Sequence, residues 1–206
     1  TRRASDLDKA SATTLTASWS GSAITLPSAT RSGYTFNGWY TAASGGTKIG
    51  NAGASYTPTA ATTLYAQWTA NKYTVTLNAN GATSSGTTSV SATYGSAMPA
   101  ITKPSKSYKV TFNGNGGSAG SSSLTSTYTF GGYYSGSTQY YTASGASARA
   151  WNKASATTLT ASWSGGSITL PSATRSGYTF NGWYTAASGG TKVGNAGTSY
   201  TPTQTT

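Results

Sequence analysis

The chain has 206 residues and carries 13 Lys and Arg against two acidic residues, Asp6 and Asp8, with no His and no Cys. Without His and Cys there are no histidine bases, thiols, disulfides or Cys or His metal sites, and the two carboxylates lie near the N-terminus, so we expect neither an enzyme nor a cofactor. Ser and Thr make up roughly a third of the chain, yet 12% of residues are aromatic, which favours ordered β structure with an aromatic core.

An internal repeat sets the predicted domain boundaries. The segments Lys9–Thr62 and Lys153–Thr206, called the first copy and the second copy below, are identical at 48 of 54 positions. With three shorter motifs they predict the end of a truncated repeat over 1–19, a short β repeat over 20–69, a long β repeat over 70–164 with an inserted hairpin or half-module, and a truncated short β repeat over 165–206. We therefore expect these residues to be a window of a longer array.

The first motif in chain order, A-T-T-L-x-A-x-W, occurs at Ala12–Trp19, Ala61–Trp68 and Ala156–Trp163. Its period of two predicts a strand with Leu, Ala and Trp on one face. The three occurrences keep this face and vary the other, so the kept face is the predicted core. It contributes the core residues Leu15, Trp19, Leu64, Trp68, Leu159 and Trp163.

The second motif, Y-T-F-x-G-[WY]-Y, occurs at Tyr34–Tyr40, Tyr128–Tyr134 and Tyr178–Tyr184. It adds Phe36, Phe130 and Phe180 to the predicted core. Two structures are compatible with the Asn37-Gly38 pair inside it. A two-residue hairpin would leave very short arms, whereas a β-bulge would keep one strand and re-aim Trp39.

The third motif, Y-x-V-T-[LF]-N-x-N-G, occurs at Tyr73–Gly81 and Tyr108–Gly116. Each occurrence predicts a strand followed by a turn, because Asn and Gly tolerate positive φ, and the strands place Val75 and Val110 in the core. The only helical signal is weak: Ala143–Trp151 is Ala-rich and is expected to form one or two turns.

Together these motifs resemble the Listeria–Bacteroides repeat, which is related to the B-repeats of internalin-type surface proteins. The resemblance rests on Tyr73–Gly81, Gly33–Thr41 and Thr63–Thr69 and covers nearly the whole chain after about residue 10. It implies a mainly β fold of tandem, small β-grasp-like modules with long loops and little helix. It also implies an extracellular or cell-surface location, a role in stalks or adhesive spacers, and no catalytic residues.

Two groups of side chains are candidate contact residues. The adjacent rings of Tyr133-Tyr134 and of Tyr140-Tyr141 point to opposite faces of an extended chain, so one ring of each pair is expected to be exposed for subunit contacts or glycan stacking. The densest basic group is Lys103, Lys106 and Lys109. Because the basic residues are otherwise dispersed, we expect no nucleic-acid partner.

The sequence thus predicts a non-enzymatic extracellular protein in which stacked β modules form a stalk, fibre or sheath. Its expected partners are neighbouring repeats or other copies of itself. The alternative is an adhesin module that recognises a glycan or an anionic polymer of the cell envelope. No apolar run is long enough for membrane insertion.

Overall fold

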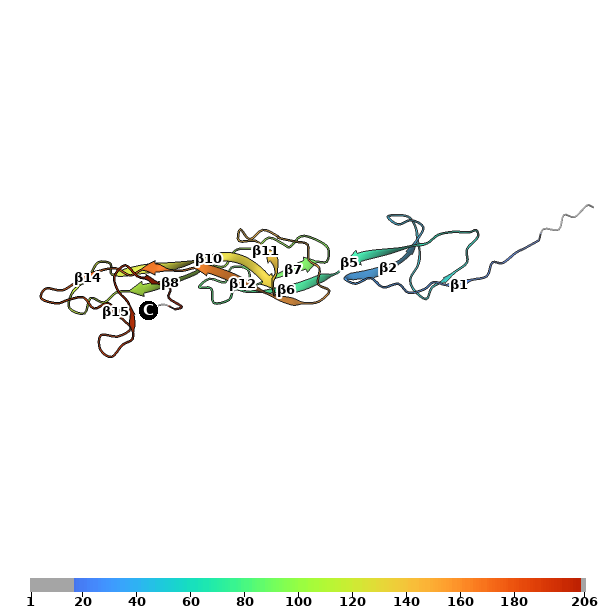
Figure 1. Cartoon of the computed structure of the whole chain (residues 1–206). Helices are drawn as coiled ribbons and strands as arrows, with labels where there is room; N and C mark the ends of the chain where they lie inside the picture. Colours follow the sequence, from blue (N-terminus) through green and yellow to red (C-terminus); the bar gives the residue numbers. More distant parts are fainter. Residues whose placement is uncertain (1–16, 205–206) are drawn as a thin grey trace, which may run out of the picture. The chain divides into compact units, whose positions relative to one another are not determined.

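The computed structural model of the chain describes residues 17–204, and every helix or strand assigned in this range is a β-strand (Figure 1). The mainly β fold predicted from the sequence is confirmed. None of the described segments forms a helix that could traverse a lipid bilayer.

The expected helical turns at Ala143–Trp151 are wrong, because this segment is one tight turn at 143–144 followed by irregular chain with isolated β-bridges at Ser147 and Ala150. The Gly145 amide bonds to the Thr142 carbonyl, and the Thr142 amide bonds to the Ala146 carbonyl. Gly145 has a φ of 87°, which a right-handed helix does not accommodate. A glycine in the centre of the segment therefore outweighs the helix propensity of its alanines.

The described residues divide into two compact units, each considered separately. Unit 1 comprises 17–30 and 36–69, and unit 2 comprises 31–35 and 70–204. Unit 1 contains a pair formed by β1 (Ile24–Thr25) and β4 (Ser55–Tyr56), and most of a sheet in which β2 (Tyr34–Tyr40) lies between β3 (Lys48–Gly50) and β5 (Tyr65–Ala70).

The central strand β2 settles the question of Asn37-Gly38. The strand continues through both residues, with Gly38 at a φ of 124°, so the hairpin alternative is wrong. Its register against β3 shifts between Trp39 and Tyr40, as at a β-bulge. The Trp39 indole N–H donates to the Pro27 carbonyl oxygen at 2.8 Å and thereby fixes the ring direction.

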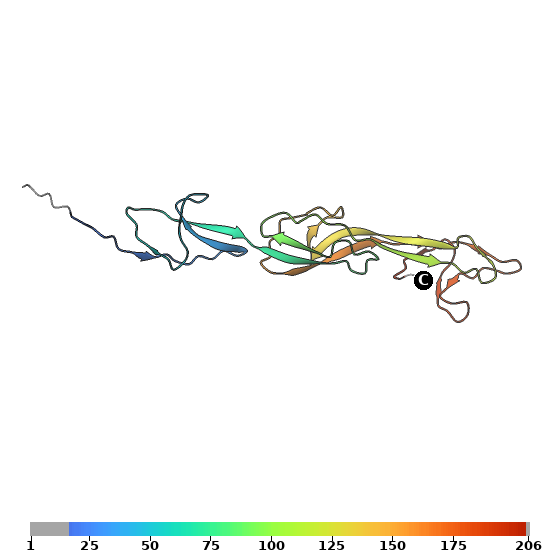
Figure 2. The same cartoon turned by 180° about the vertical axis from the view of Figure 1, so that it is seen from behind.

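The main sheet of unit 2 has the strand order β11–β10–β12–β6–β7, with β8 paired to the remaining part of β10. The β12–β6 pair is parallel and the other pairs are antiparallel. Figures 1 and 2 show the long β10 reaching from β11 and β12 to β8. The strands are β6 (Lys72–Asn78), β7 (Ser89–Thr93), β8 (Lys106–Thr111), β10 (Ser123–Ser135), β11 (Thr138–Tyr141) and β12 (Thr157–Gly165).

Short two-stranded sheets complete unit 2. They pair β13 (Ile168–Thr169) with β17 (Ser199–Tyr200), β14 (Ala173–Thr174) with β9 (Ser118–Ala119), and β15 (Trp183–Tyr184) with β16 (Lys192–Gly194). β9 comes from the long repeat and β14 from the second copy. The β9–β14 pair therefore joins two successive repeats.

Unit 2 has two hydrophobic cores, and each contains one occurrence of the third motif. The main core surrounds Val75, Leu77, Phe130, Trp151 and Leu159. The second core contains Val110, Phe112, Leu170 and Trp183. The first Y-x-V-T strand, β6, thus lies in the main core, while the second, β8, packs against the second copy.

The predicted core residues differ widely in burial. Phe130, Val75, Val110 and Leu159 are buried, whereas Phe36, Leu64, Trp68 and Trp163 are half-buried. Trp19 is 91% exposed and Phe180 is 36% exposed, so their assignment to the core is wrong. Neither lies in a strand that pairs with any described part of the chain, and the motif alone does not bury them. Leu15 lies outside the described residues.

Candidate binding groove

The tyrosine pairs do not form the expected exposed surface. Tyr133, Tyr140 and Tyr141 are buried, and the prediction that one ring of each pair is exposed is wrong for Tyr140-Tyr141. Tyr140 contacts Trp151 on one side of β11, and Tyr141 contacts Tyr133 and donates to the Pro99 carbonyl on the other. Both sides of the strand are covered, because the long loops fold over it.

Tyr134 is the more exposed member of its pair, but it is still half-buried. Its hydroxyl donates to the Gly131 carbonyl oxygen at 3.3 Å. Among the tyrosines of the main core, burial raises the pKa of Tyr133, and burial together with the neighbouring Tyr133 raises the pKa of Tyr141 to about 12. These hydroxyls are neutral at physiological pH and contribute to packing rather than to acid–base chemistry.

The three lysines do not share one surface. Strand alternation places Lys106 on the same face of β8 as Val110, and Lys109 on the opposite face. The Lys106 ammonium lies 4.9 Å from the centre of the Tyr128 ring, a cation–π contact within the chain. Lys103 lies in the connection before β8, where its aliphatic stem passes close to Gly145. A continuous basic patch is therefore absent from these three positions.

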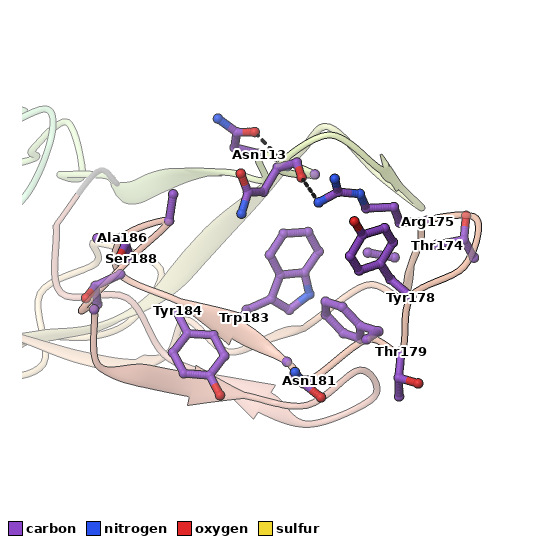
Figure 3. A pocket seen from close by; sticks show the side chains of 18 of the residues that line it. Asn113, Thr174, Arg175, Tyr178, Thr179, Asn181, Trp183, Tyr184, Ala186 and Ser188 are labelled. Atoms are coloured by element: carbon purple, nitrogen blue, oxygen red, sulfur yellow. Dashed lines mark hydrogen bonds between the residues drawn. The ribbon is translucent and has the colours of Figure 1, made fainter.

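A groove of about 670 Å³ lies instead between the turn at 111–115 and the second copy (Figure 3). None of the predicted contact residues lines it. The groove walls carry exposed aromatic rings, side-chain amides and a glycine-rich loop, and the residues that line it are Thr111, Asn113, Gly114, Asn115, 173–175 and 178–190.

Trp183 is the fixed centre of the groove. Its indole N–H donates to the Pro171 carbonyl oxygen at 2.7 Å, and its ring packs against Phe112 at 4.8 Å between centroids. Phe180 meets the same ring at 5.4 Å. Trp183 is therefore held from both sides, although Phe180 keeps an exposed face.

The rim of the groove combines charge and aromatic surface. The Arg175 guanidinium lies 4.0 Å from the centre of the Tyr178 ring and donates to the Asn115 carbonyl oxygen at 3.1 Å. Tyr178 is itself 67% exposed. Figure 3 shows these side chains on one side of Trp183, with Tyr184 on the other. The described part of the chain contains no Asp, Glu, His or Cys.

The equivalent residues of the first copy are not open. There Phe36 contacts Trp68 of β5 at 5.3 Å, and the Gln67 amide of β5 donates to the carbonyl oxygens of Ala42 and Gly45. The Asn37 side chain also bonds to the hydroxyl of Thr69. The groove in the second copy is thus the surface that β5 covers in the first.

The repeat arithmetic contained the signal for this groove. Tyr178–Tyr184 repeats Tyr34–Tyr40 residue for residue, so the aromatic residues of the groove could be located from the repeat. The prediction of Phe180 as a core residue was wrong because burial was inferred from the motif and not from the pairing of its strand.

Comparison with known proteins gives a family match and a relative. The description of the matching family is the Listeria–Bacteroides repeat domain, and the matched residues are 6–67 and 157–206. Internalin H of Listeria monocytogenes serovar 1/2a is 50% identical over 52 residues, which are 25% of this chain and 9% of internalin H. The matched segment thus covers less than a tenth of that relative's length. No solved structure matches the chain.

Proposed function

Because the chain belongs to the Listeria–Bacteroides repeat family, we propose that it is a non-enzymatic structural segment of a cell-surface protein, whose β modules stack into a stalk or fibre. The family match and the similarity to internalin H support a surface location. The polar, Thr- and Ser-rich surface with few charges is in keeping with an extracellular setting.

The observation that carries this proposal is the hydrophobic core shared by two successive repeats. Val110 and Phe112 come from the long repeat, whereas Leu170 and Trp183 come from the second copy, and the four side chains form one buried cluster. In repeat proteins such shared cores couple each unit to its neighbour. A module that buries part of its apolar surface against the next module is suited to a stacked array.

Polar contacts reinforce the same boundary. The buried Ser126 hydroxyl on β10 donates to the Gly166 carbonyl, and the Tyr128 hydroxyl donates to the Pro202 carbonyl at 2.6 Å. The Gly120 amide bonds to the Ser172 carbonyl at 2.7 Å. Three positions of the long repeat thus bind backbone carbonyls of the second copy, and the boundary is specific in register as well as apolar.

Negative-stain electron microscopy of the chain at low and high salt tests the fibre. We expect regular filaments that persist at high salt, because apolar burial and neutral hydrogen bonds are insensitive to ionic screening. Dispersed particles at every protein concentration would refute fibre formation, and filaments that dissolve at high salt would show that charge rather than packing holds them together.

A second candidate function is adhesion to an anionic polymer of the cell envelope. The net charge is +11, and residues 17–204 contain no acidic side chain that could neutralise their lysines and arginines. Such a surface attracts polyanions over a range set by ionic strength. Binding to a soluble polyphosphate or acidic polysaccharide, measured from low salt to about 0.5 M NaCl, tests this candidate. Affinity that does not depend on salt would contradict the electrostatic basis.

A further inference from the structure

A second groove, also of about 670 Å³, lies within the long repeat and does not involve the second copy. We call it the β12 groove. Its floor is the outward face of β12, where Thr158, Thr160 and Ser162 are exposed and alternate with the buried Leu159 and Ala161. The hydroxyls of the floor are therefore open to a ligand. The other residues that line this groove are Asn80, Tyr134, Ser135, Gly136 and Trp163.

One wall of the β12 groove is an aromatic ring held in a fixed orientation. Tyr134 lies opposite Thr160 in the pairing of β10 with β12, so its side chain is on the same outward face of the sheet. The Tyr134 hydroxyl and the Gln139 amide both donate to the Gly131 carbonyl oxygen, at 3.3 and 3.2 Å. Tyr134 is half-buried rather than buried, so part of its ring remains open to a ligand.

The opposite wall is the turn that follows β6. There the Asn80 side-chain amide donates to the Ala161 carbonyl oxygen at 2.9 Å, and the Trp163 indole N–H donates to the Ala79 carbonyl oxygen at 3.1 Å. The pairing of β6 with β12 ends at Thr160, so the next carbonyl of β12 is already occupied by the Asn80 side chain. This arrangement disfavours the addition of a peptide strand and favours a ligand that binds side chains. Because both walls are fixed, a ligand loses little affinity to ordering them.

Three positions at the β12 groove carry smaller residues than the matching positions of the short repeat at 20–69. The pairs, with the short repeat first, are Asn37 and Gly131, Tyr65 and Thr160, and Gln67 and Ser162. In the short repeat, Gln67 donates to two carbonyls of the loop 41–47 that connects β2 and β3, whereas residues 136–137 alone connect β10 and β11. The long repeat thus opens a surface that the short repeat fills with its own side chains and loop.

The end of the β12 groove at Ser135 is positively charged. The Lys153 ammonium donates to the Ser135 hydroxyl oxygen at 2.9 Å. An ammonium has three N–H donors, so donors remain for a ligand after this bond is made. The described residues include no carboxylate that could neutralise the charge. Hydroxyls on the floor, an aromatic wall and a cation at one end together fit a ligand made of hydroxyl-bearing rings that carries a carboxylate.

We propose that the β12 groove binds a linear saccharide that contains uronic acid. A sugar ring packs its C–H face on Tyr134, its hydroxyls bond to Thr158, Thr160 and Ser162, and its carboxylate pairs with Lys153. A few polar groups on a fixed frame orient a ligand and give specificity. The proposal rests on the adhesion candidate described above and gives it a site, whereas attraction by net charge alone needs no groove.

Matched oligosaccharides test the class of ligand. The probes are linear tetrasaccharides of glucuronate, galacturonate and mannuronate, each beside its neutral parent of glucose, galactose or mannose. Each probe is titrated into the 206-residue chain and followed by amide chemical shifts. We expect at least one uronate to bind with a dissociation constant below about 1 mM and roughly threefold more tightly than its parent, the gain from one exposed ion pair. Raising NaCl to about 0.5 M should reduce this difference without removing binding of the parent.

Substitutions that restore the residues of the short repeat close the β12 groove without changing the net charge. Thr160→Tyr and Ser162→Gln should each weaken uronate binding roughly tenfold, because each removes a hydroxyl from the floor and fills space that the sugar needs. Both positions are exposed, so the main core should be unaffected. Amide shifts of Val75 and Trp151, which are buried in that core, report whether each variant keeps its fold.

Substitutions at the wall and at the charged end separate the two parts of the proposed contact. Tyr134→Ala should abolish binding of the uronate and of its parent, because both sugars pack on this ring. Tyr40→Ala, at the matching position of the short repeat, should leave binding unchanged. Lys153→Gln should lower the affinity for the uronate to that for the parent and leave the parent's affinity unchanged, since only the carboxylate pairs with the ammonium.

Several results would overturn the proposal. Amide shifts that do not move with any probe at about 10 mM would do so. Binding that survives both Thr160→Tyr and Ser162→Gln would exclude the groove, and if it also vanished at high salt it would belong to general adhesion by charge. Equal affinities for a uronate and its parent would refute the pairing of a carboxylate with Lys153. None of these results decides filament formation, which electron microscopy tests separately.

Discussion

The first and second copies place the same seven residues, Y-T-F-N-G-W-Y, in two states. In the first copy they form the seven-residue strand β2, and in the second only Trp183–Tyr184 are in a strand. The neighbouring turn, the glycine φ angle and the tryptophan hydrogen bond are the same in both copies. What differs is the pairing: β2 pairs with both β3 and β5, whereas β15 pairs with β16. Strand formation here depends on the partner more than on local propensity.

The largest expected effect compares the two equivalent leucines. Leu26 and Leu170 are both 2% exposed, and Leu→Ala at either site should reduce the free energy of unfolding by about 2–5 kcal/mol. Leu170 belongs to the core shared with the long repeat, so hydrogen exchange in Leu170→Ala should also rise in β8 and β9. Leu26→Ala should leave those strands protected. Protection of β8 and β9 in both variants would show that the repeats are not coupled.

The next effect compares tryptophans at one motif position. Trp68 packs on Phe36, and Trp68→Ala should cost about 3 kcal/mol, near the low end of the range for aromatic cores because the ring is only half-buried. Trp19 is exposed, and Trp19→Ala should change stability by less than about 0.5 kcal/mol. Urea unfolding measures both. In Trp68→Ala, β2 should also lose amide protection and become like Tyr178–Gly182. Equal losses of stability in the two variants would contradict the conclusion that Trp68 is packed and Trp19 is exposed.

Alkaline pH should lower the stability of the main core of unit 2 more than that of unit 1. The ordinary pKa of tyrosine is near 10, and burial raises that of Tyr141 to about 12. The folded state thus holds this proton more tightly than the unfolded state, so its contribution is complete below pH 10 and is lost as pH rises toward 12. The free energy of unfolding should fall by about 2 kcal/mol over this pH range. Urea unfolding at several pH values measures this change. Tyr141→Phe should remove this part of the pH dependence, and an unchanged profile would refute its assignment to Tyr141.

The smallest expected effect distinguishes two buried hydroxyls in that core. The Tyr141 hydroxyl donates to Pro99 at 2.9 Å, whereas the Tyr133 hydroxyl is buried without a hydrogen-bond partner. Tyr141→Phe should therefore destabilise by about 1 kcal/mol, and Tyr133→Phe should be neutral or stabilise by up to about 1 kcal/mol. Thermal unfolding of the two variants gives the sign. A clear destabilisation by Tyr133→Phe would indicate a partner for that hydroxyl.

The period-two pattern was sufficient to predict which residues are buried in strands that pair within the described chain. Val75, Val110 and Leu159 are buried, as expected for residues that alternate with Thr or Lys on the opposite face of a sheet. The Asn-Gly turns also have the anticipated positive φ, at Asn80, Gly81, Asn115 and Gly116. These features depend on a few neighbouring residues, so a single sequence contains them.

Features that depend on distant segments could not be read in this way. Tyr140 and Tyr141 are both buried because Trp151 and Pro99, from two different loops, cover the two sides of β11. The shared core could be predicted only by knowing that the rings of Phe112 and Trp183 contact each other across a repeat boundary.

Strand β10 has a consequence for how the chain bears tension. Its 13 residues pair with β8 at one end and with β12 and β11 at the other, so one strand takes part in both cores of unit 2. A force that pulls on the C-terminal residues of the second copy acts first on the shared core, and β10 connects that core to the main core as one continuous strand. Rupture of the shared core should therefore also weaken the pairing of β10 with β12. We expect the two cores to unfold together, so force-extension traces should show one combined unfolding step for unit 2.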